Sequence, residues 1–204
     1  MNPLPRLIAA LLACLLMLPG LAAAAAAAAT APATLPADSV YRLDAALTDQ
    51  DGRALAFADA RGQVRLVSMF YASCPYVCPM LIEQGKAIEH ALDAESRARL
   101  RVLLVTLDVE RDTPEVLARL AEQRRVDTTR WTLAQPAAAD LRKIAAVLGV
   151  QYRQLPDGEF NHSTVISLLD PQGRVLAQTS RLGGEADPEF IAAVQAALKA
   201  APQD

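Results

Sequence analysis

The chain has 204 residues, with 20 lysines and arginines against 23 aspartates and glutamates, and a formal net charge of −3. Its positive charges form no continuous block that could follow a nucleic-acid backbone, which argues against nucleic-acid binding. The length suits one domain with a substantial apolar core once an N-terminal leader is set aside.

Residues 1–29 have the features of an export signal. One positive charge, Arg6, precedes an apolar run to about Leu18, and a tract rich in alanine follows. This order predicts a signal peptide, and an uncleaved membrane anchor is the alternative. We therefore expect an exported, periplasmic protein that is either free or anchored to the inner membrane. Residues 30–37 then form an Ala/Thr/Pro linker, and residues 38–201 form the working domain.

The first half of the domain predicts a β-α-β unit after a hairpin. Residues 41–57 contain two short strands around an Asp-Gly pair, the local signal of a β-hairpin. Residues 64–70, VRLVSMF, are mostly apolar and rich in β-branched and aromatic side chains, which predicts a strand buried on both faces. Residues 80–92 repeat apolar side chains at helical spacing, and residues 101–108 predict a second buried strand.

The second half continues the alternation of helices and strands. Thr113 followed by Pro114 is a helix start signal, and residues 137–150 predict another helix. Residues 163–180 predict a β-hairpin, and residues 187–200 predict a closing amphipathic helix. The order of elements predicts an α/β fold: a thioredoxin-like mixed sheet with flanking helices and an N-terminal β-hairpin extension.

Two cysteines remain in the domain once Cys14 is assigned to the leader. Cys74 and Cys78 directly follow the strand predicted over residues 64–70, and sites in α/β sheets form beyond the carboxyl ends of the strands. A cysteine near a helix N-terminus meets free N–H groups and the positive end of the helix dipole, which lower its pKa. We therefore expect both sulfurs to be good nucleophiles and good metal ligands.

Three roles are open to this cysteine pair. A structural disulfide would close a loop of about five residues and contribute only about 2 kcal/mol, less than the roughly 3 kcal/mol of a 15-residue loop. A redox-active pair would exchange disulfides, although such sites normally have two intervening residues, and here Pro75, Tyr76 and Val77 intervene. A metal site would need at least one further ligand, which His90 or His162 could supply.

The two histidines differ in position. His90 lies past the second turn of the helix that follows the cysteines, so it should point to solvent or away from the site. His162 precedes a strand that we place at the sheet centre, in a loop expected to lie against the cysteine loop. Cys74, Cys78 and His162 would then form a three-ligand set that suits copper or zinc, with sulfur favouring copper(I). The alternative is a loop histidine hydrogen-bonded to backbone.

Three blocks of sequence follow one another between about Val40 and Leu198: FYASCPYVCPM, LVTLDVERDTPEVLARL and FNHSTVISLLDPQGRV. Together they resemble the Sco/SenC family of copper-binding, thioredoxin-like proteins. The resemblance implies that Cys74, Cys78 and His162 bind a copper ion. It also implies a metallochaperone that assists maturation of the dinuclear copper centre of cytochrome c oxidase. Its partner would be a copper-accepting, membrane-bound oxidase subunit or another copper protein.

Two rival functions use the same cysteines: a thiol-disulfide oxidoreductase that reduces the acceptor's cysteines, and a copper-binding redox sensor. Tyr76 stands where many relatives have an aspartate, so one carboxylate near the metal is missing. Thioredoxin-type oxidoreductases resemble one another in carrying a cis-proline just before the strand that faces their cysteines, where it pairs with the substrate chain. This chain has no proline between Asp157 and Asp170, which favours metal handling over disulfide exchange. Helix capping and strand-end solvation explain Asp108 and Asp112, and Asp108 alone is a candidate to support a ligand.

Overall fold

A computed structural model describes residues 34–202 of the chain. The expected leader, residues 1–29, and the first part of the linker lie outside the described residues. Contacts within the chain group Leu35–Asp204 into one compact unit. In the described part, no helix is both long enough and apolar enough to cross a membrane.

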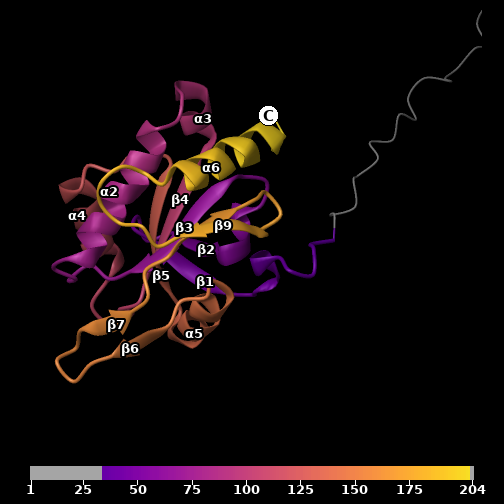
Figure 1. The fold of residues 1–204 in the computed structure, drawn as a ribbon. Helices are drawn as coiled ribbons and strands as arrows, with labels where there is room; N and C mark the ends of the chain where they lie inside the picture. Colours follow the sequence, from indigo (N-terminus) through magenta and orange to yellow (C-terminus); the bar gives the residue numbers. More distant parts are fainter. Residues whose placement is uncertain (1–33, 203–204) are drawn as a thin grey trace, which may run out of the picture. The chain divides into compact units, whose positions relative to one another are not determined.

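Helices and strands alternate along the domain, as the sequence predicts (Figure 1). The strands are β1 (Ala46–Asp49), β2 (Ala54–Ala56), β3 (Arg65–Phe70), β4 (Arg101–Thr106), β5 (Trp131–Pro136), β6 (Tyr152–Gln154), β7 (Phe160–His162), β8 (Ile166–Leu169) and β9 (Val175–Thr179). The α-helices are α2 (Val77–His90), α3 (Ala94–Arg99), α4 (Pro114–Gln123), α5 (Ala138–Val147) and α6 (Pro188–Ala200). Short 3-10 helices are η1 (Val40–Arg42) and η2 (Phe57–Ala60).

Most of the strands join one mixed sheet. It has seven strands in the order β2-β1-β5-β4-β3-β8-β9, and β6 pairs with β7 in a separate hairpin. β3, β4 and β5 are parallel neighbours, as helical crossovers require, and the remaining pairs are antiparallel. The N-terminal hairpin extends this sheet, because Leu47 of β1 lies opposite Pro136 of β5. The predicted mixed sheet with flanking helices is confirmed.

Each face of the sheet has its own apolar core. Along β3 the side chains alternate: Leu66 and Phe70 join the core beneath α2, α4 and α6, whereas Val67 and Met69 join the core beneath α5 and the 3-10 helices. A strand covered on both faces buries both sides of its pleat, so it reads as a continuous apolar run. The strand that leads into the cysteines is therefore held rigidly from both sides.

The sequence patterns do not predict β5, α3 or the β6–β7 hairpin. β5 reads WTLAQP, and its terminal Pro136 resembles a strand breaker, although proline is tolerated at a strand end. α3 is six residues long and buries none of them, and the two hairpin strands have three residues each. The expectation that β8 lies at the sheet centre is wrong. β8 is the second strand from one edge, between β3 and the edge strand β9, because β4, β5 and the N-terminal hairpin extend the sheet on the other side of β3.

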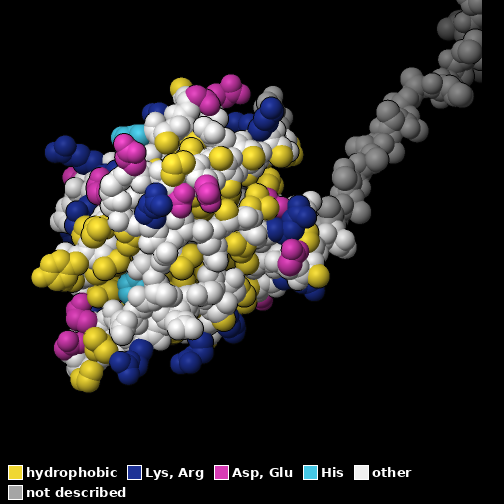
Figure 2. Space-filling view, viewed as in Figure 1, with side chains coloured by type: hydrophobic (Ala, Val, Ile, Leu, Met, Phe, Trp, Pro, Cys, Tyr) yellow, Lys and Arg dark blue, Asp and Glu magenta, His cyan; other side chains and the backbone are white. Residues whose placement is uncertain are grey.

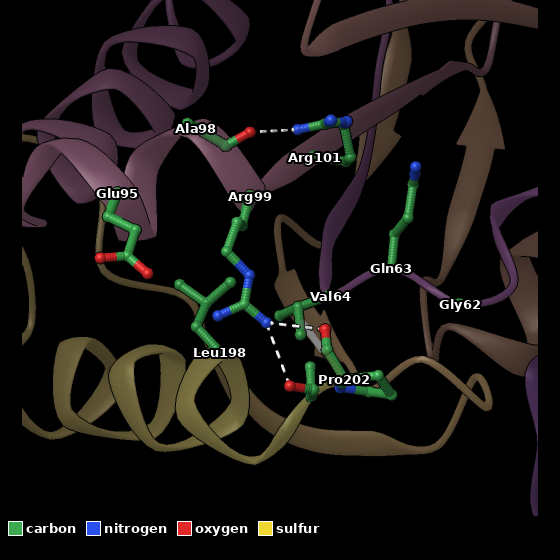
Figure 3. A pocket seen from close by; sticks show the side chains of 10 residues that line it. Gly62, Gln63, Val64, Glu95, Ala98, Arg99, Arg101, Leu198 and Pro202 are labelled. Atoms are coloured by element: carbon green, nitrogen blue, oxygen red, sulfur yellow. Dashed lines mark hydrogen bonds between the residues drawn. The ribbon is translucent and has the colours of Figure 1, made fainter. Parts of the chain in front are cut away.

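Arginine side chains at the end of α3 and the start of β4 bind backbone oxygens there, and Arg99 ties α3 to the residues that follow α6 (Figure 3). Arg99 Nη2 donates to the carbonyl oxygens of Ala201 (3.1 Å) and Pro202 (3.0 Å). Arg101 Nη1 donates to the carbonyl oxygen of Ala98 (2.6 Å). The hollow of about 270 Å³ between these residues lies near the start of β3, whereas the cysteines follow its end. The guanidinium groups of Arg99 and Arg101 already donate to backbone oxygens, so we interpret this hollow as a gap between packed elements and not as a binding site.

Candidate metal centre

The cysteine loop connects the end of β3 to the start of α2. The chain turns where the Cys74 N–H donates to the Tyr71 carbonyl oxygen (3.3 Å), and α2 begins at Val77. Cys78 therefore lies in the first turn of α2, whereas the sequence pattern places the helix after Pro79. A proline fits this first turn because the N–H it lacks would have no partner within the helix.

The two thiols lie against each other at the helix N-terminus. The Cys78 N–H donates to Cys74 Sγ (3.4 Å), and the Tyr71 N–H donates to Cys78 Sγ (3.4 Å). Both are free thiols, and Cys74 is 8% exposed against 2% for Cys78. Backbone donors thus hold both sulfurs, and Cys74 is the more accessible of the two.

The two thiols differ in acidity. Burial acts to raise the pKa of Cys74, but hydrogen bonds led by the N–H groups of Cys78 and Tyr76 outweigh it, so the pKa of Cys74 is lowered. Burial raises the pKa of Cys78, and the charges of Cys74 and Asp112 raise it further. The expectation that both sulfurs are acidified is therefore wrong for Cys78, because its burial outweighs the favourable position at the helix start.

Tyr71 contacts both the cysteine loop and the β6–β7 hairpin, which carries His162. The His162 ring packs edge-on against the Tyr71 ring with centroids 5.8 Å apart, and the Phe160 ring lies 5.3 Å from it. The Tyr71 hydroxyl donates to Glu159 Oε2 (3.0 Å). Burial, together with hydrogen bonds to Cys74 and Glu159, raises the pKa of Tyr71. Tyr71 therefore contacts both the cysteine loop and the imidazole ring of His162.

His162 is half-buried at the end of β7, with Nδ1 3.1 Å from the Ser163 carbonyl oxygen. Burial lowers the pKa of His162, which favours the neutral imidazole that binds metals. Because Nδ1 donates its proton to the Ser163 carbonyl oxygen, the lone pair of Nε2 is free to bind a metal ion. Among the described residues, no three His, Cys, Asp or Glu side chains gather as a metal site. The structure thus brings Cys74 and Cys78 together, and the ligand set that includes His162 stays a prediction.

The loop between β4 and α4 supports the cysteine loop through Asp112. Asp112 Oδ2 accepts hydrogen bonds from the Ala72 N–H (2.8 Å) and from Thr106 Oγ1 (2.5 Å). Burial raises the pKa of Asp112, and its two hydrogen bonds oppose this rise. Asp108 instead forms an ion pair with Arg111. Asp112, rather than Asp108, is therefore the carboxylate that positions the cysteine loop.

Arg111 joins the same loop to the β6–β7 hairpin. Its Nη2 donates to the Gly158 carbonyl oxygen (2.5 Å), and its Nη1 lies 3.7 Å from Glu159 Oε1. Glu159 also accepts the hydrogen bond from Tyr71. Polar contacts therefore run from the β4–α4 loop through the hairpin to Tyr71, and they hold the histidine-bearing hairpin against the start of the cysteine loop.

The remaining histidine takes no part in this arrangement. His90 is exposed at the last residue of α2, as the sequence predicts. Tyr71, Glu159 and Arg111 are the residues of the site that the sequence analysis does not identify. Tyr71 and Glu159 are 88 positions apart, so no local spacing could pair them. An aromatic residue next to the cysteine motif was the available signal for Tyr71.

Comparisons with known proteins identify relatives of this chain. Residues 38–199 match the family model described as SCO1/SenC. A mitochondrial SCO2 homolog of Bos taurus is 30% identical over 136 residues, which cover 64% of this chain and 50% of that protein. A protein of Stutzerimonas stutzeri described as copper-binding is 25% identical over 131 residues, 62% of this chain and 63% of that protein. The match therefore spans about half the length of the mitochondrial relative.

Solved structures share the fold. A SCO1/SenC family lipoprotein from Bacillus anthracis str. Ames superposes with a TM-score of 0.67 at 22% identity, over 76% of this chain and 94% of that chain. Bradyrhizobium japonicum ScoI with copper bound gives a TM-score of 0.64 at 22% identity, over 76% and 98% of the two chains. At such low identities the likeness establishes the thioredoxin-like α/β fold and nothing finer.

Proposed function

Because this chain belongs to the SCO1/SenC family, we propose that it binds a copper ion through Cys74, Cys78 and His162 and delivers it to an acceptor in the exported space. The proposed acceptor is the dinuclear copper centre of cytochrome c oxidase, on a membrane-bound subunit. The observation that carries the proposal is the pair of thiols at the start of α2, held by the N–H groups of Cys78 and Tyr71. The Tyr71 ring also contacts the His162 ring. Relatives solved with copper bound support the choice of metal.

The donor chemistry fits copper. Two thiolates and one neutral imidazole are soft to intermediate ligands, which favour copper(I) over harder divalent ions. Cys74 is already acidified, whereas Cys78 must give up a proton against a raised pKa when the metal binds. Copper affinity is therefore expected to fall as pH falls, because protons compete with the metal for both sulfurs.

An open coordination position allows delivery. Three protein ligands leave room for a ligand of the acceptor, and the copper ion can pass by stepwise exchange without being released into solution. A protein in exported space, free or tethered through its N-terminal residues, would meet a membrane-bound acceptor on the same side of the membrane. Catalysis is not required for this role.

One observation favours a second function, reduction of the acceptor's disulfide. The acidified, more accessible Cys74 has the features of an attacking thiolate, and the buried Cys78 those of a resolving thiol. Cys74 would attack the acceptor disulfide and displace one thiol, and Cys78 would then displace the other. Two electrons pass to the acceptor, Cys74 and Cys78 end as a disulfide, and a thiol reductant must restore them.

A copper titration of the reduced protein tests the ligand set. We expect one copper ion per chain, and we expect His162→Ala to lower the affinity by at least about 100-fold, beyond the 10–100-fold typical of an outer-shell partner. His90→Ala is the matched control, because His90 is exposed at the far end of α2. Its affinity should equal that of the wild type.

Three outcomes would count against this function. Equal affinity in the His162→Ala and His90→Ala variants would remove His162 from the ligand set. Steady reduction of a disulfide-bonded acceptor at a rate that neither copper nor His162→Ala alters would favour the oxidoreductase. Reversible copper redox without transfer to an apo acceptor would favour a redox sensor.

A further inference from the structure

Gln84 is a buried polar residue without a hydrogen-bond partner. It lies on α2, is 1% exposed, and neither its side-chain nitrogen nor its oxygen is paired within the part of the chain that the structure describes. An unpaired buried amide costs about 1–3 kcal/mol, so such a group in a folded protein calls for an explanation. Gln84 also lines a hollow of about 220 Å³ between α2 and the loop that precedes α6.

The walls of this hollow suit an apolar side chain. Pro79 and Met80 of α2 form one wall, and Gly183 and Gly184 form the other. A Cβ on Gly183 would lie 3.1 Å from Met80 Cε, so the absence of a side chain there keeps the hollow open. Both glycines have a φ of +76°, which glycine adopts without strain.

Exposed apolar side chains also lie at the junction of the cysteine loop and α2, next to the hollow along the chain. Tyr76 is 77% exposed, Met80 44% and Val77 36%. Figure 2 shows hydrophobic side chains gathered on the side of the molecule where the loop before α2 protrudes. Large apolar side chains clustered at a surface mark an interaction site. A chain lying in the hollow would therefore lie beside the first turn of α2, which carries Cys78.

We propose that this groove, lined by Pro79, Met80, Gly183 and Gly184 with Gln84 at its base, binds an extended peptide segment of the copper acceptor. A backbone peptide group offers one N–H and one C=O, which are the partners that the carboxamide of Gln84 lacks. Because both carboxamide atoms are buried, binding requires rotation about the side-chain bonds of Gln84 toward the entering chain. An apolar side chain of the segment fills the hollow.

The charges around the groove favour an uncharged segment. Glu83, the acidic residue that lines the groove, already pairs with Lys86 (3.1 Å). The proposal rests on the proposed function for the identity of the acceptor, because delivery of copper by ligand exchange needs the acceptor's ligands beside Cys74. The groove itself stands on Gln84 and its surroundings, independently of the metal.

The test follows the side-chain amide resonances of Gln84 by NMR in the reduced protein. The probe is a capped seven-residue peptide of alternating serine and valine with a central leucine, compared with the same peptide N-methylated at the leucine. We expect saturable shifts at Gln84 and about three- to tenfold weaker binding of the methylated peptide, which has lost one N–H donor.

Variants separate the groove from general apolar adhesion. Gln84→Leu and Met80→Ala should each weaken peptide binding about threefold or more, since one removes the polar partner and the other an apolar wall. Leu176→Ala is the matched control, because Leu176 is 47% exposed on β9 and lies outside the groove. Gln84→Leu should fold at least as stably as the wild type, since it removes an unpaired buried amide. If Gln84→Leu does not fold, the difference in affinity between the unmethylated and the N-methylated peptide for the wild type still tests the proposal.

Several results would overturn the proposal. Absence of saturable shifts at Gln84, or peptide binding by Gln84→Leu as tight as that of the wild type, would show that the carboxamide does not bind the peptide. Binding by the compact unit Leu35–Asp204 but not by the full chain would assign the groove to the chain's own N-terminal residues. Self-association that covers the groove would assign it to a second copy. Copper affinity measured on the same samples shows separately whether the proposed function stands.

Discussion

Cys74 and Cys78 carry the same functional group four positions apart, yet their surroundings give them opposite acidities. Hydrogen bonds lower the pKa of Cys74 against the effect of burial, whereas burial raises the pKa of Cys78. The difference arises over one helical turn: Cys74 precedes α2 and is stabilised by the N–H groups of Cys78 and Tyr76, while Cys78 lies inside α2 and is more deeply buried. The pair therefore contains one acidified, more accessible thiol and one buried thiol with a raised pKa.

This asymmetry predicts selective alkylation. Iodoacetamide should modify Cys74 first, with a rate that rises with pH and reaches half its maximum below the value of about 8.5 typical of free cysteine. The lowered pKa makes thiolate available at lower pH, whereas Cys78 should react slowly even at high pH. Peptide mass spectrometry measures both sites, and Cys74→Ser isolates Cys78. Earlier modification of Cys78, or a Cys74 midpoint at or above that of free cysteine, would contradict this assignment.

At the scale of elements, the β6–β7 hairpin depends on neighbours rather than on its own pairing. A two-stranded hairpin alone is marginally stable in water, and this one has three residues in each strand. Arg111 supplies a hydrogen bond to Gly158 and an ion pair with Glu159, and Tyr71 adds a hydrogen bond to the same carboxylate. The position of His162 is therefore set by the β4–α4 loop and the cysteine loop.

Removal of the Arg111 contacts should loosen this hairpin. Arg111→Ala is expected to speed hydrogen exchange of amides over residues 155–160 by about fivefold, because a partly exposed ion pair with one charge-assisted hydrogen bond contributes about 1 kcal/mol. Exchange followed by mass spectrometry measures the change. Arg153→Ala, an exposed arginine on β6, is the control and should leave the rates unchanged. Equal protection in both variants would mean that Arg111 does not hold the hairpin.

At the scale of the whole molecule, helices pack on both faces of the sheet, and at one of these contacts the packing leaves room only for a glycine. Gly85 of α2 faces Trp131 of β5, and a Cβ there would lie 2.5 Å from Trp131 Cη2. Trp131 is 1% exposed and its Nε1 donates to Glu89 Oε2 (2.9 Å), so the ring is fixed in place. α2, which carries Cys78, is thereby docked against the centre of the sheet.

This contact predicts a stability effect opposite to helix propensity. Gly85→Ala should gain about 1 kcal/mol of helix propensity, but overpacking costs about 1–3 kcal/mol. Because the contact is so short, we expect the free energy of unfolding to fall by about 1 kcal/mol. Denaturant titration measures it. In a Trp131→Phe background, which removes the clashing ring atoms, the same substitution should cost less stability. A Gly85→Ala protein more stable than the wild type would rule out the close contact between Gly85 and the Trp131 ring.

Local patterns determined much of this protein before any tertiary contact is considered. The mostly apolar run VRLVSMF indicates a strand covered on both faces, Thr113 and Pro114 mark the start of α4, and the Asp-Gly pair marks the first hairpin. The cysteines after a buried strand locate the site. These signals are local because periodicity, capping and turns depend on residues a few positions apart.

The tertiary structure alone decided which side chains meet. The contact of His162 with Tyr71, the support of Ala72 by Asp112, and the unpaired carboxamide beside the Gly183 loop join segments distant in the chain. It also reversed the expected acidity of Cys78. Burial and distance depend on how the strands are ordered and how the helices pack on them, and neither is encoded in the spacing of any single motif.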